Sequence, residues 1–147
     1  MLQYTAQFTA PLAREQVFAD ISRFDRASQW DPGVEAGEMV TAEPVGQGSR
    51  FLLQCRFLGR TIPLEYEIVG FESGARLVLR AENAHVLSVD TITFVSAGDH
   101  ATTITYHATL DPRGATRLAT PLLALAFRRI GDAAANGLRA RLGVTAA

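Results

Sequence analysis

The chain begins with a segment in which apolar and polar residues alternate. Polar residues between positions 2 and 10 separate four apolar ones, Tyr4, Ala6, Phe8 and Ala10. A period of two is typical of a strand with one buried face. The alternation therefore predicts a strand over residues 2–10.

Helical spacing replaces this alternation after Pro11. The apolar residues that then share one helical face are Leu12, Val17, Phe18 and Ile21. A second short helix is expected over residues 23–29. It must end before the sequence Trp30-Asp31-Pro32-Gly33, because Pro and Gly interrupt regular structure.

Residues 34–110 consist of short apolar and β-branched runs separated by turn signals. These signals lie at residues 45–48, 58–61, 72–75, 84–87 and 98–100. Six strands are expected in this region. Their short connections require antiparallel neighbours, because a parallel pair needs a long crossover.

A long helix is predicted after residues 111–114. Thr120-Pro121 resembles an N-cap followed by proline at the first helical position, so the helix can restart or kink there. Its apolar face consists of Leu123, Phe127, Ile130, Ala134 and Leu138. The order of elements predicts an α+β helix-grip fold. In it, a curved seven-stranded antiparallel sheet surrounds the C-terminal helix, and two short helices lie between strands 1 and 2.

Length and composition fit one folded domain over residues 1–147. The chain has 147 residues, of which 48% are hydrophobic and 20% charged, and this composition excludes a disordered chain. A net charge of -1 argues against a nucleic-acid partner. The single cysteine, Cys55, forms neither a disulfide pair nor a zinc-ligand motif.

The first residues lack the basic and apolar regions of a signal peptide. The longest apolar helical run, residues 121–127, is far shorter than the ~20 residues that span a bilayer. We therefore expect a cytoplasmic protein with no integral membrane segment, no cofactor and no metal, and a homodimer is compatible with the sequence.

Several short motifs resemble those of a known family. They are Phe8-Thr9-Ala10-Pro11, Val17-Phe18, Trp30-Asp31-Pro32 and Gly46-Gln47-Gly48-Ser49-Arg50. With the closing helix, they resemble polyketide cyclase/dehydrase-type members of the START and plant-allergen-like (SRPBCC) superfamily. The resemblance covers nearly the whole chain and implies a hydrophobic cavity between sheet and helix. It implies no particular chemistry, since members include lipid carriers, aromatase/cyclases and hydrolases.

The turn positions also predict which residues align across the sheet. Turns at residues 59–60, 73–74, 84–87 and 98 produce two inward-facing rows. The first row consists of Phe51, Ile68, Leu79, Ile92 and Tyr106. The second consists of Leu53, Tyr66, Ala81, Asp90 and Ala108. The alanines beside Asp90 leave space above its carboxylate, and both tyrosines are near enough to reach it.

Asp90 is the strongest candidate for a functional residue. A buried carboxylate without partners is unfavourable, and burial raises its pKa. It could be a polar anchor or proton acceptor in an apolar pocket. Alternatively it is a structural residue bonded to Tyr66, to Tyr106 or to the C-terminal helix, or a β-bulge turns it to solvent.

Other candidates are weaker. Glu38 would face the cavity only if the loop at residues 46–48 spans four residues, and an exposed Glu is the commoner case. Arg129 borders the apolar face of the last helix and could pair with Asp90 or with an acidic ligand. The three histidines cannot converge on one ion; they are His85, His100 and His107.

Three functional hypotheses follow. The first is binding of a small hydrophobic or amphipathic molecule, such as a fatty acid, isoprenoid, polyketide or sterol-like compound. The second is a cofactor-independent aromatase/cyclase-type enzyme in which Asp90 transfers a proton while Tyr66 or Tyr106 polarises a carbonyl. The third is a filled cavity and a function at the surface. The expected ligand contacts are Trp30, Phe51, Leu53, Tyr66, Leu79, Asp90, Ile92, Tyr106, Phe127 and Ile130.

Overall fold

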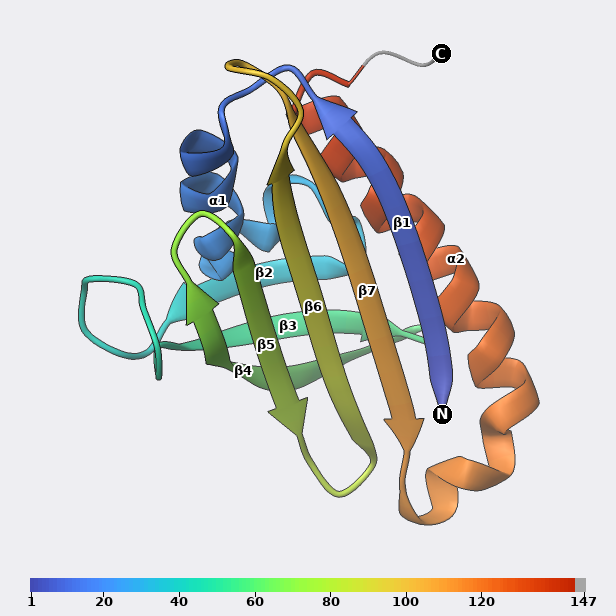
Figure 1. The fold of residues 1–147 in the computed structure, drawn as a ribbon. Helices are drawn as coiled ribbons and strands as arrows, with labels where there is room; N and C mark the ends of the chain where they lie inside the picture. The colour runs from blue at the N-terminus through green and yellow to red at the C-terminus, as the bar shows by residue number, and fades with distance from the viewer. Residues whose placement is uncertain (145–147) are drawn as a thin grey trace.

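A computed structural model describes residues 1–144 and has the α+β helix-grip architecture (Figure 1). Its elements in chain order are β1 (Leu2–Ala10), α1 (Arg14–Ser22), the 3-10 helix η1 (Phe24–Gln29), β2 (Val34–Met39), β3 (Arg50–Phe57), β4 (Arg60–Glu72), β5 (Arg76–Glu82), β6 (Val86–Ser96), β7 (Thr102–Pro112), the 3-10 helix η2 (Gly114–Ala119) and α2 (Thr120–Arg141). These elements confirm the predicted fold class.

The seven strands form one antiparallel sheet in the order β1-β7-β6-β5-β4-β3-β2. Strand β1 therefore pairs with the last strand, and the sheet curves so that β2–β4 run across β5–β7 in Figure 1. Helix α2 lies along β1, and α1 and η1 lie toward the other end of the concave face. Site residues can thus come from both ends of the sequence.

The β6–β7 hairpin has the predicted register: Asp90 pairs with Ala108, and Ile92 pairs with Tyr106. The β3–β4 hairpin differs from its predicted register by two residues. Its turn is centred on Leu58 and Gly59, whose φ values are 51° and 78°, and not on residues 59–60.

This earlier turn changes the neighbours of the residues further along β3. Phe51 pairs with Tyr66 instead of Ile68. The β5–β6 connection is also tighter than expected, because Glu82 pairs with Leu87. As a result Asp90 lies opposite Leu79, and Ala81 lies opposite Ser88.

A shift of two residues preserves which face each side chain occupies. Asp90 and Ile92 therefore face inward as predicted, and the other inward side chains of β6 are Val86, Ser88 and Phe94. The observed cross-strand partners differ from the predicted ones, and the partners determine which polar side chains can form hydrogen bonds.

Two glycines let helix α2 approach the rest of the domain closely. A Cβ atom at Gly137 would lie 1.7 Å from the carbonyl oxygen of Trp30, and one at Gly131 would lie 2.6 Å from the Tyr4 ring. These positions fix the helix over β1 and the η1–β2 loop. Among the helices of residues 1–144, none combines the length and the hydropathy needed to cross a bilayer.

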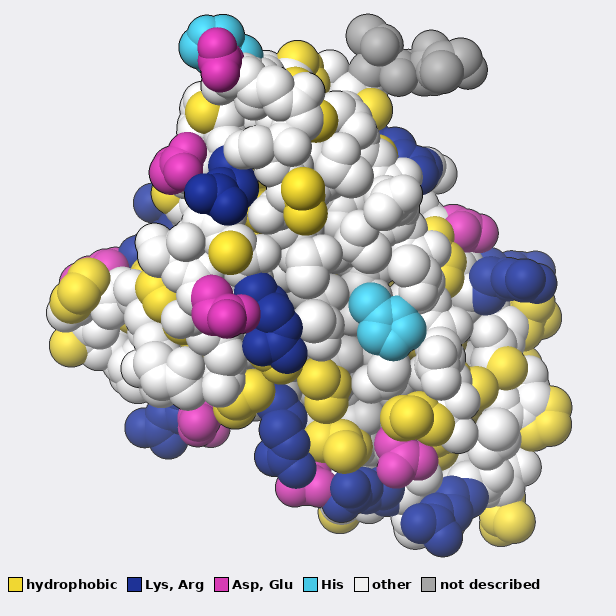
Figure 2. Space-filling view, in the orientation of Figure 1, with side chains coloured by type: hydrophobic (Ala, Val, Ile, Leu, Met, Phe, Trp, Pro, Cys, Tyr) yellow, Lys and Arg dark blue, Asp and Glu magenta, His cyan; other side chains and the backbone are white. Residues whose placement is uncertain are grey.

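Charged side chains of both signs are interspersed on the face of the molecule drawn in Figure 2. Ion pairs join neighbouring charges on strands β4 and β5, for example Arg80 with Glu82 at 3.0 Å and Arg76 with Glu72 at 3.6 Å. Neighbouring opposite charges offset each other, so this face has a mixed electrostatic character.

Candidate ligand-binding site

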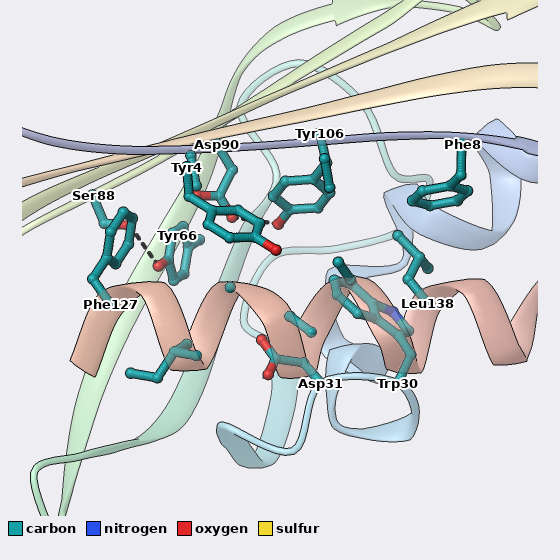
Figure 3. A pocket seen from close by; sticks show the side chains of 16 residues that line it. Tyr4, Phe8, Trp30, Asp31, Tyr66, Ser88, Asp90, Tyr106, Phe127 and Leu138 are labelled. Carbon is teal, nitrogen blue, oxygen red and sulfur yellow. Dashed lines mark hydrogen bonds between the residues drawn. The ribbon is translucent and has the colours of Figure 1, made fainter. Parts of the chain in front are cut away.

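The concave face of the sheet and helix α2 enclose a cavity of about 110 Å³ (Figure 3). Strands β1, β4, β6 and β7 form one wall, α2 forms the other, and Trp30 and Asp31 enter from the η1–β2 loop. A second cavity of about 100 Å³ extends toward β3. The residues that line both cavities are Asp31, Tyr66, Ser88, Asp90, Phe127 and Ile130.

Asp90 projects from β6 into this shared region (Figure 3) and is 8% exposed. Its Oδ2 accepts a hydrogen bond from the Tyr106 hydroxyl at 2.5 Å. Within residues 1–144, no donor reaches Oδ1. Burial raises the pKa of Asp90 to about 7, the Tyr106 hydrogen bond opposes that rise, and the charge of Asp31 adds to it. The group therefore exchanges protons near neutral pH.

Asp31 is a second carboxyl in the same region. Its Oδ1 accepts a hydrogen bond from the Gly33 backbone amide at 2.8 Å. Burial raises its pKa to about 6, and the Gly33 hydrogen bond opposes this rise. In the sequence, Asp31 stands out only as part of a turn and of the Trp30-Asp31-Pro32 motif. Its position next to Trp30, an expected site residue, was the signal that could have identified it.

Within residues 1–144, Tyr66 forms no hydrogen bond with Asp90. Its hydroxyl shares a hydrogen bond of 2.8 Å with the Ser88 hydroxyl. The observed β5–β6 register places Ser88, and not Asp90, opposite Ala81 and so in the cross-strand row of Tyr66. Burial raises the pKa of both Tyr66 and Tyr106 well above the ordinary value, and nearby Asp90 adds to each rise. Both hydroxyls therefore remain protonated and can donate hydrogen bonds at neutral pH.

Tyr4 lines the cavity from β1, and the sequence reasoning did not include it. Its hydroxyl donates to Asp132 Oδ1 on α2 at 2.6 Å, which ties the first strand to the last helix. Burial, followed by this hydrogen bond, raises the pKa of Tyr4 to about 12. The alternation of β1 already placed Tyr4 inward, and only the β1–β7 pairing was lacking.

The expected ligand contacts divide into two groups. Six of them line the first cavity, and Leu53 lines the second; the six are Trp30, Tyr66, Asp90, Tyr106, Phe127 and Ile130. Phe51, Leu79 and Ile92 line neither cavity and are fully buried in the packed core. These three side chains belong to the core and not to the cavity wall: Phe24, for example, packs against Phe51 at a ring distance of 6.4 Å.

The weaker candidates lie outside this site. Glu38 is exposed and pairs with Leu52, and Arg129 and His85 are exposed as well. Cys55 lines the second cavity, and burial raises its pKa to about 12. In the described part of the chain, no group of three or more His, Cys, Asp or Glu side chains is placed to hold a metal ion.

The family described as polyketide cyclase / dehydrase and lipid transport matches residues 1–143. The chain belongs to this family. No curated protein is a significant match to the sequence. The family assignment therefore rests on nearly the full length of the chain, and it joins cyclases and lipid carriers under one description.

Solved structures share the fold at low sequence identity. The Zhui aromatase/cyclase from Streptomyces sp. R1128 has a TM-score of 0.80 at 13% identity, with 96% of this chain and 93% of that chain covered. A START superfamily protein from Mycobacterium smegmatis has a TM-score of 0.73 at 13% identity, covering 96% and 97%. A protein from Thermus thermophilus has a TM-score of 0.75 at 17% identity, covering 99% of both chains. Similarity at this level shows a common architecture.

Proposed function

We propose that the protein binds a small amphipathic molecule in the cavity between the sheet and helix α2. One observation carries this proposal: the nearly buried carboxylate of Asp90 presents a free oxygen to a cavity with largely apolar walls. A buried carboxylate without a partner is unfavourable, whereas a few polar groups in an apolar pocket are typical of ligand sites. A hydrogen-bond donor on a bound ligand would supply the missing partner of the free Asp90 oxygen.

The size of the site limits the ligand. The adjoining cavities measure about 110 and 100 Å³, whereas pockets for drug-sized ligands measure roughly 300–1,000 Å³. A molecule of one or two rings suits this space better than a sterol or a long fatty acid. Within the range of ligands expected from the sequence, the small amphipathic ones are therefore favoured.

A cyclase-type reaction is the second candidate function. It is favoured by the pKa of Asp90, about 7, because a general acid or base works best with a pKa near the working pH. In this scheme Asp90 would transfer the proton, and Tyr106 or Tyr66 would donate a hydrogen bond to a carbonyl oxygen. An Asp90→Asn variant that keeps its fold would lose turnover if the protein is an enzyme, and would only change in affinity if it is a carrier.

Native mass spectrometry of protein purified without denaturants tests the binding function. We expect a co-purified small molecule in the wild type and its loss in Ala134→Leu, because Ala134 lines the cavity. Ala124→Leu is the matched control, since Ala124 lies on the exposed side of the same helix. If both variants retain the co-purified molecule equally, then the ligand binds outside this cavity. The proposal would be contradicted if the wild type carries no co-purified molecule and also binds no added compound of one or two rings.

A cytoplasmic location and a homodimer remain predictions that accompany this function. Cell fractionation tests the first, and light scattering coupled to gel filtration tests the second. Neither is required by the binding proposal, because every residue that lines the two cavities comes from one chain.

A further inference from the structure

The two carboxyl groups in the cavity point to the chemical class of the ligand. We propose that it is a small organic amine, bound as an ammonium ion by Asp31 and Asp90 with its apolar part against helix α2. This inference rests on the proposed binding function and goes beyond it by naming the group that the site recognises.

The charge of the cavity lining favours a cation. Two aspartates line the first cavity, and its sixteen lining residues include neither Arg nor His. The one basic residue in contact with either cavity is Arg56, at the second cavity, where its side chain is 62% exposed and pairs with Glu35 at 2.9 Å. A carboxylate ligand would therefore meet two like charges, whereas an ammonium ion would meet two opposite ones.

The hydrogen-bonding pattern also matches an ammonium ion. Asp90 presents Oδ1, and Asp31 presents Oδ2, because the other oxygen of each carboxylate already accepts a hydrogen bond. When ionised, both carboxylates accept hydrogen bonds and donate none, and an ammonium ion has three donors and no acceptor. A charge-assisted hydrogen bond is about twice as strong as a neutral one, so this pairing is the most favourable use of the two free oxygens.

Aromatic rings line the cavity that holds the two carboxyls, and Tyr4, Tyr66 and Tyr106 lie near Asp90 in Figure 3. Trp30 and Tyr106 form an edge-to-face pair with ring centroids 6.1 Å apart, and Tyr4 and Phe127 line the same cavity. The faces of aromatic rings attract cations, most strongly where water is excluded. The rings therefore add to the attraction of the carboxylates and also accommodate the apolar part of the amine.

Amine binding must depend on pH, because it needs ionised carboxyls. The titratable groups that face Asp90 are Asp31, Cys55, Tyr66 and Tyr106, with Tyr4 opposite on β1. Helix α2 presents apolar residues to the cavity; beyond them, Asp132 accepts the Tyr4 hydroxyl and Arg139 lies 5.3 Å from the centre of the Phe8 ring.

Of these cavity groups, only Asp31 and Asp90 change charge between pH 5 and 8. Their pKa values are about 6 and about 7, and burial raises the pKa values of the cysteine and the tyrosines far above this range. Binding of an ammonium ion thus releases protons, and affinity rises with pH. A carboxylate ligand would show the opposite trend.

Trp30 is the only tryptophan of the chain, so its fluorescence reports directly on the cavity. The test is a titration with three compounds of the same skeleton: 2-phenylethylamine, 2-phenylethanol and 3-phenylpropionate. We expect the amine to bind most tightly and the carboxylate most weakly. The affinity for the amine should increase about tenfold or more from pH 5 to pH 8, and the affinity for the alcohol should change little.

Substitutions identify the groups responsible. Asp90→Asn and Asp31→Asn should each weaken amine binding by about 10- to 100-fold, the range for loss of a hydrogen bond to a charged group. Each should change alcohol binding by less than about threefold. Glu65→Gln is the control, since Glu65 is exposed on β4 next to Tyr66 and should leave all three affinities unchanged.

The outcomes separate this inference from the proposed function. Tighter binding of the alcohol or the carboxylate than of the amine, or affinity for the amine that falls with rising pH, overturns the amine assignment alone. The same holds if a molecule co-purifies but 2-phenylethylamine fails to bind. Absence of both an adduct and any fluorescence response overturns the binding function together with the amine assignment.

Discussion

The concave face of the sheet has two regions that differ in packing, although strand β6 crosses both. In the closed region, Ile92 and Phe94 of β6 are 0% and 2% exposed and are covered by other core residues. In the open region, Ser88 and Asp90 of the same strand face the cavity under α2. One repeat of the strand, the two residues from Asp90 to Ile92, thus separates a polar site from a packed core.

The difference arises from what covers each region. Phe18 of α1 packs edge-to-face on Phe94 and on Phe71, at ring distances of 5.2 Å in both cases, and fills the closed region. Over the open region, α2 presents small residues, among them Gly131 and Ala134. The comparison shows that the cavity depends on the residues of the covering helix as much as on the sheet.

The largest expected effect is the loss of stability when a large side chain is removed from the closed region. Phe94→Ala removes a fully packed ring, and such a substitution lowers the free energy of unfolding by about 3–5 kcal/mol. Phe127→Ala in the open region should lower it by less than about 1.5 kcal/mol, because Phe127 is half-buried and already borders empty space. Urea denaturation measures both; equal losses would mean that the two regions are packed alike.

A second prediction concerns pH and the cost of the buried carboxyl. Because the pKa of Asp90 rises from 3.8 to about 7 on folding, the folded state holds a proton that the unfolded state has lost between these values. Stability therefore falls as pH rises from about 4 to 7 and stays low above pH 7. This rise in pKa corresponds to about 4 kcal/mol at most.

Asp90→Asn removes this titration and keeps an acceptor for the Tyr106 hydroxyl. We expect the variant to be more stable than the wild type by about 2–4 kcal/mol at pH 8 and nearly equal to it at pH 4. Urea denaturation at the two pH values measures this difference. The exposed control Glu65→Gln should show no such pH dependence. A difference between Asp90→Asn and wild type that is the same at both pH values would mean that Asp90 is not buried as a carboxyl.

The sequence predicts the fold and the inward face of β6 because both depend on periodicity alone. The predicted alignment of Asp90 and Ile92 with β7 is correct, because the loop at Gly98 has the expected register. The turns predicted at residues 59–60 and 84–87 lie instead at residues 58–59 and 84–85, so both registers differ from the prediction by two residues. The shifts left Phe51, Asp90 and Ile92 on their predicted face but exchanged their cross-strand neighbours.

The exchange of neighbours explains what the sequence could not predict about the site. Tyr66 was expected beside Asp90 and instead meets Ser88, because a hydrogen bond between side chains requires the register as well as the face. Asp31 and Tyr4 reach the site from segments whose placement depends on the curvature of the sheet and on the packing of α2. Neither property follows from local periodicity.

The smallest expected effect tests the hydrogen bond that this register creates. Tyr66 and Ser88 are both buried, and their hydroxyl oxygens lie 2.8 Å apart at the boundary of the open region. A double-mutant cycle with Tyr66→Phe and Ser88→Ala should give a coupling energy of about 1 kcal/mol. Urea denaturation of the four proteins supplies the values.

The matched control is the pair Thr9 and Thr103, whose hydroxyls lie 3.1 Å apart across β1 and β7 on the exposed face. Water replaces a lost partner there, so Thr9→Ala and Thr103→Ala should couple by only a few tenths of a kcal/mol. If the two cycles give the same coupling, then water reaches Tyr66 and Ser88 as freely as it reaches the outer face. The open region would then be a solvent-filled cleft, and the buried-carboxyl argument for Asp90 would fail with it.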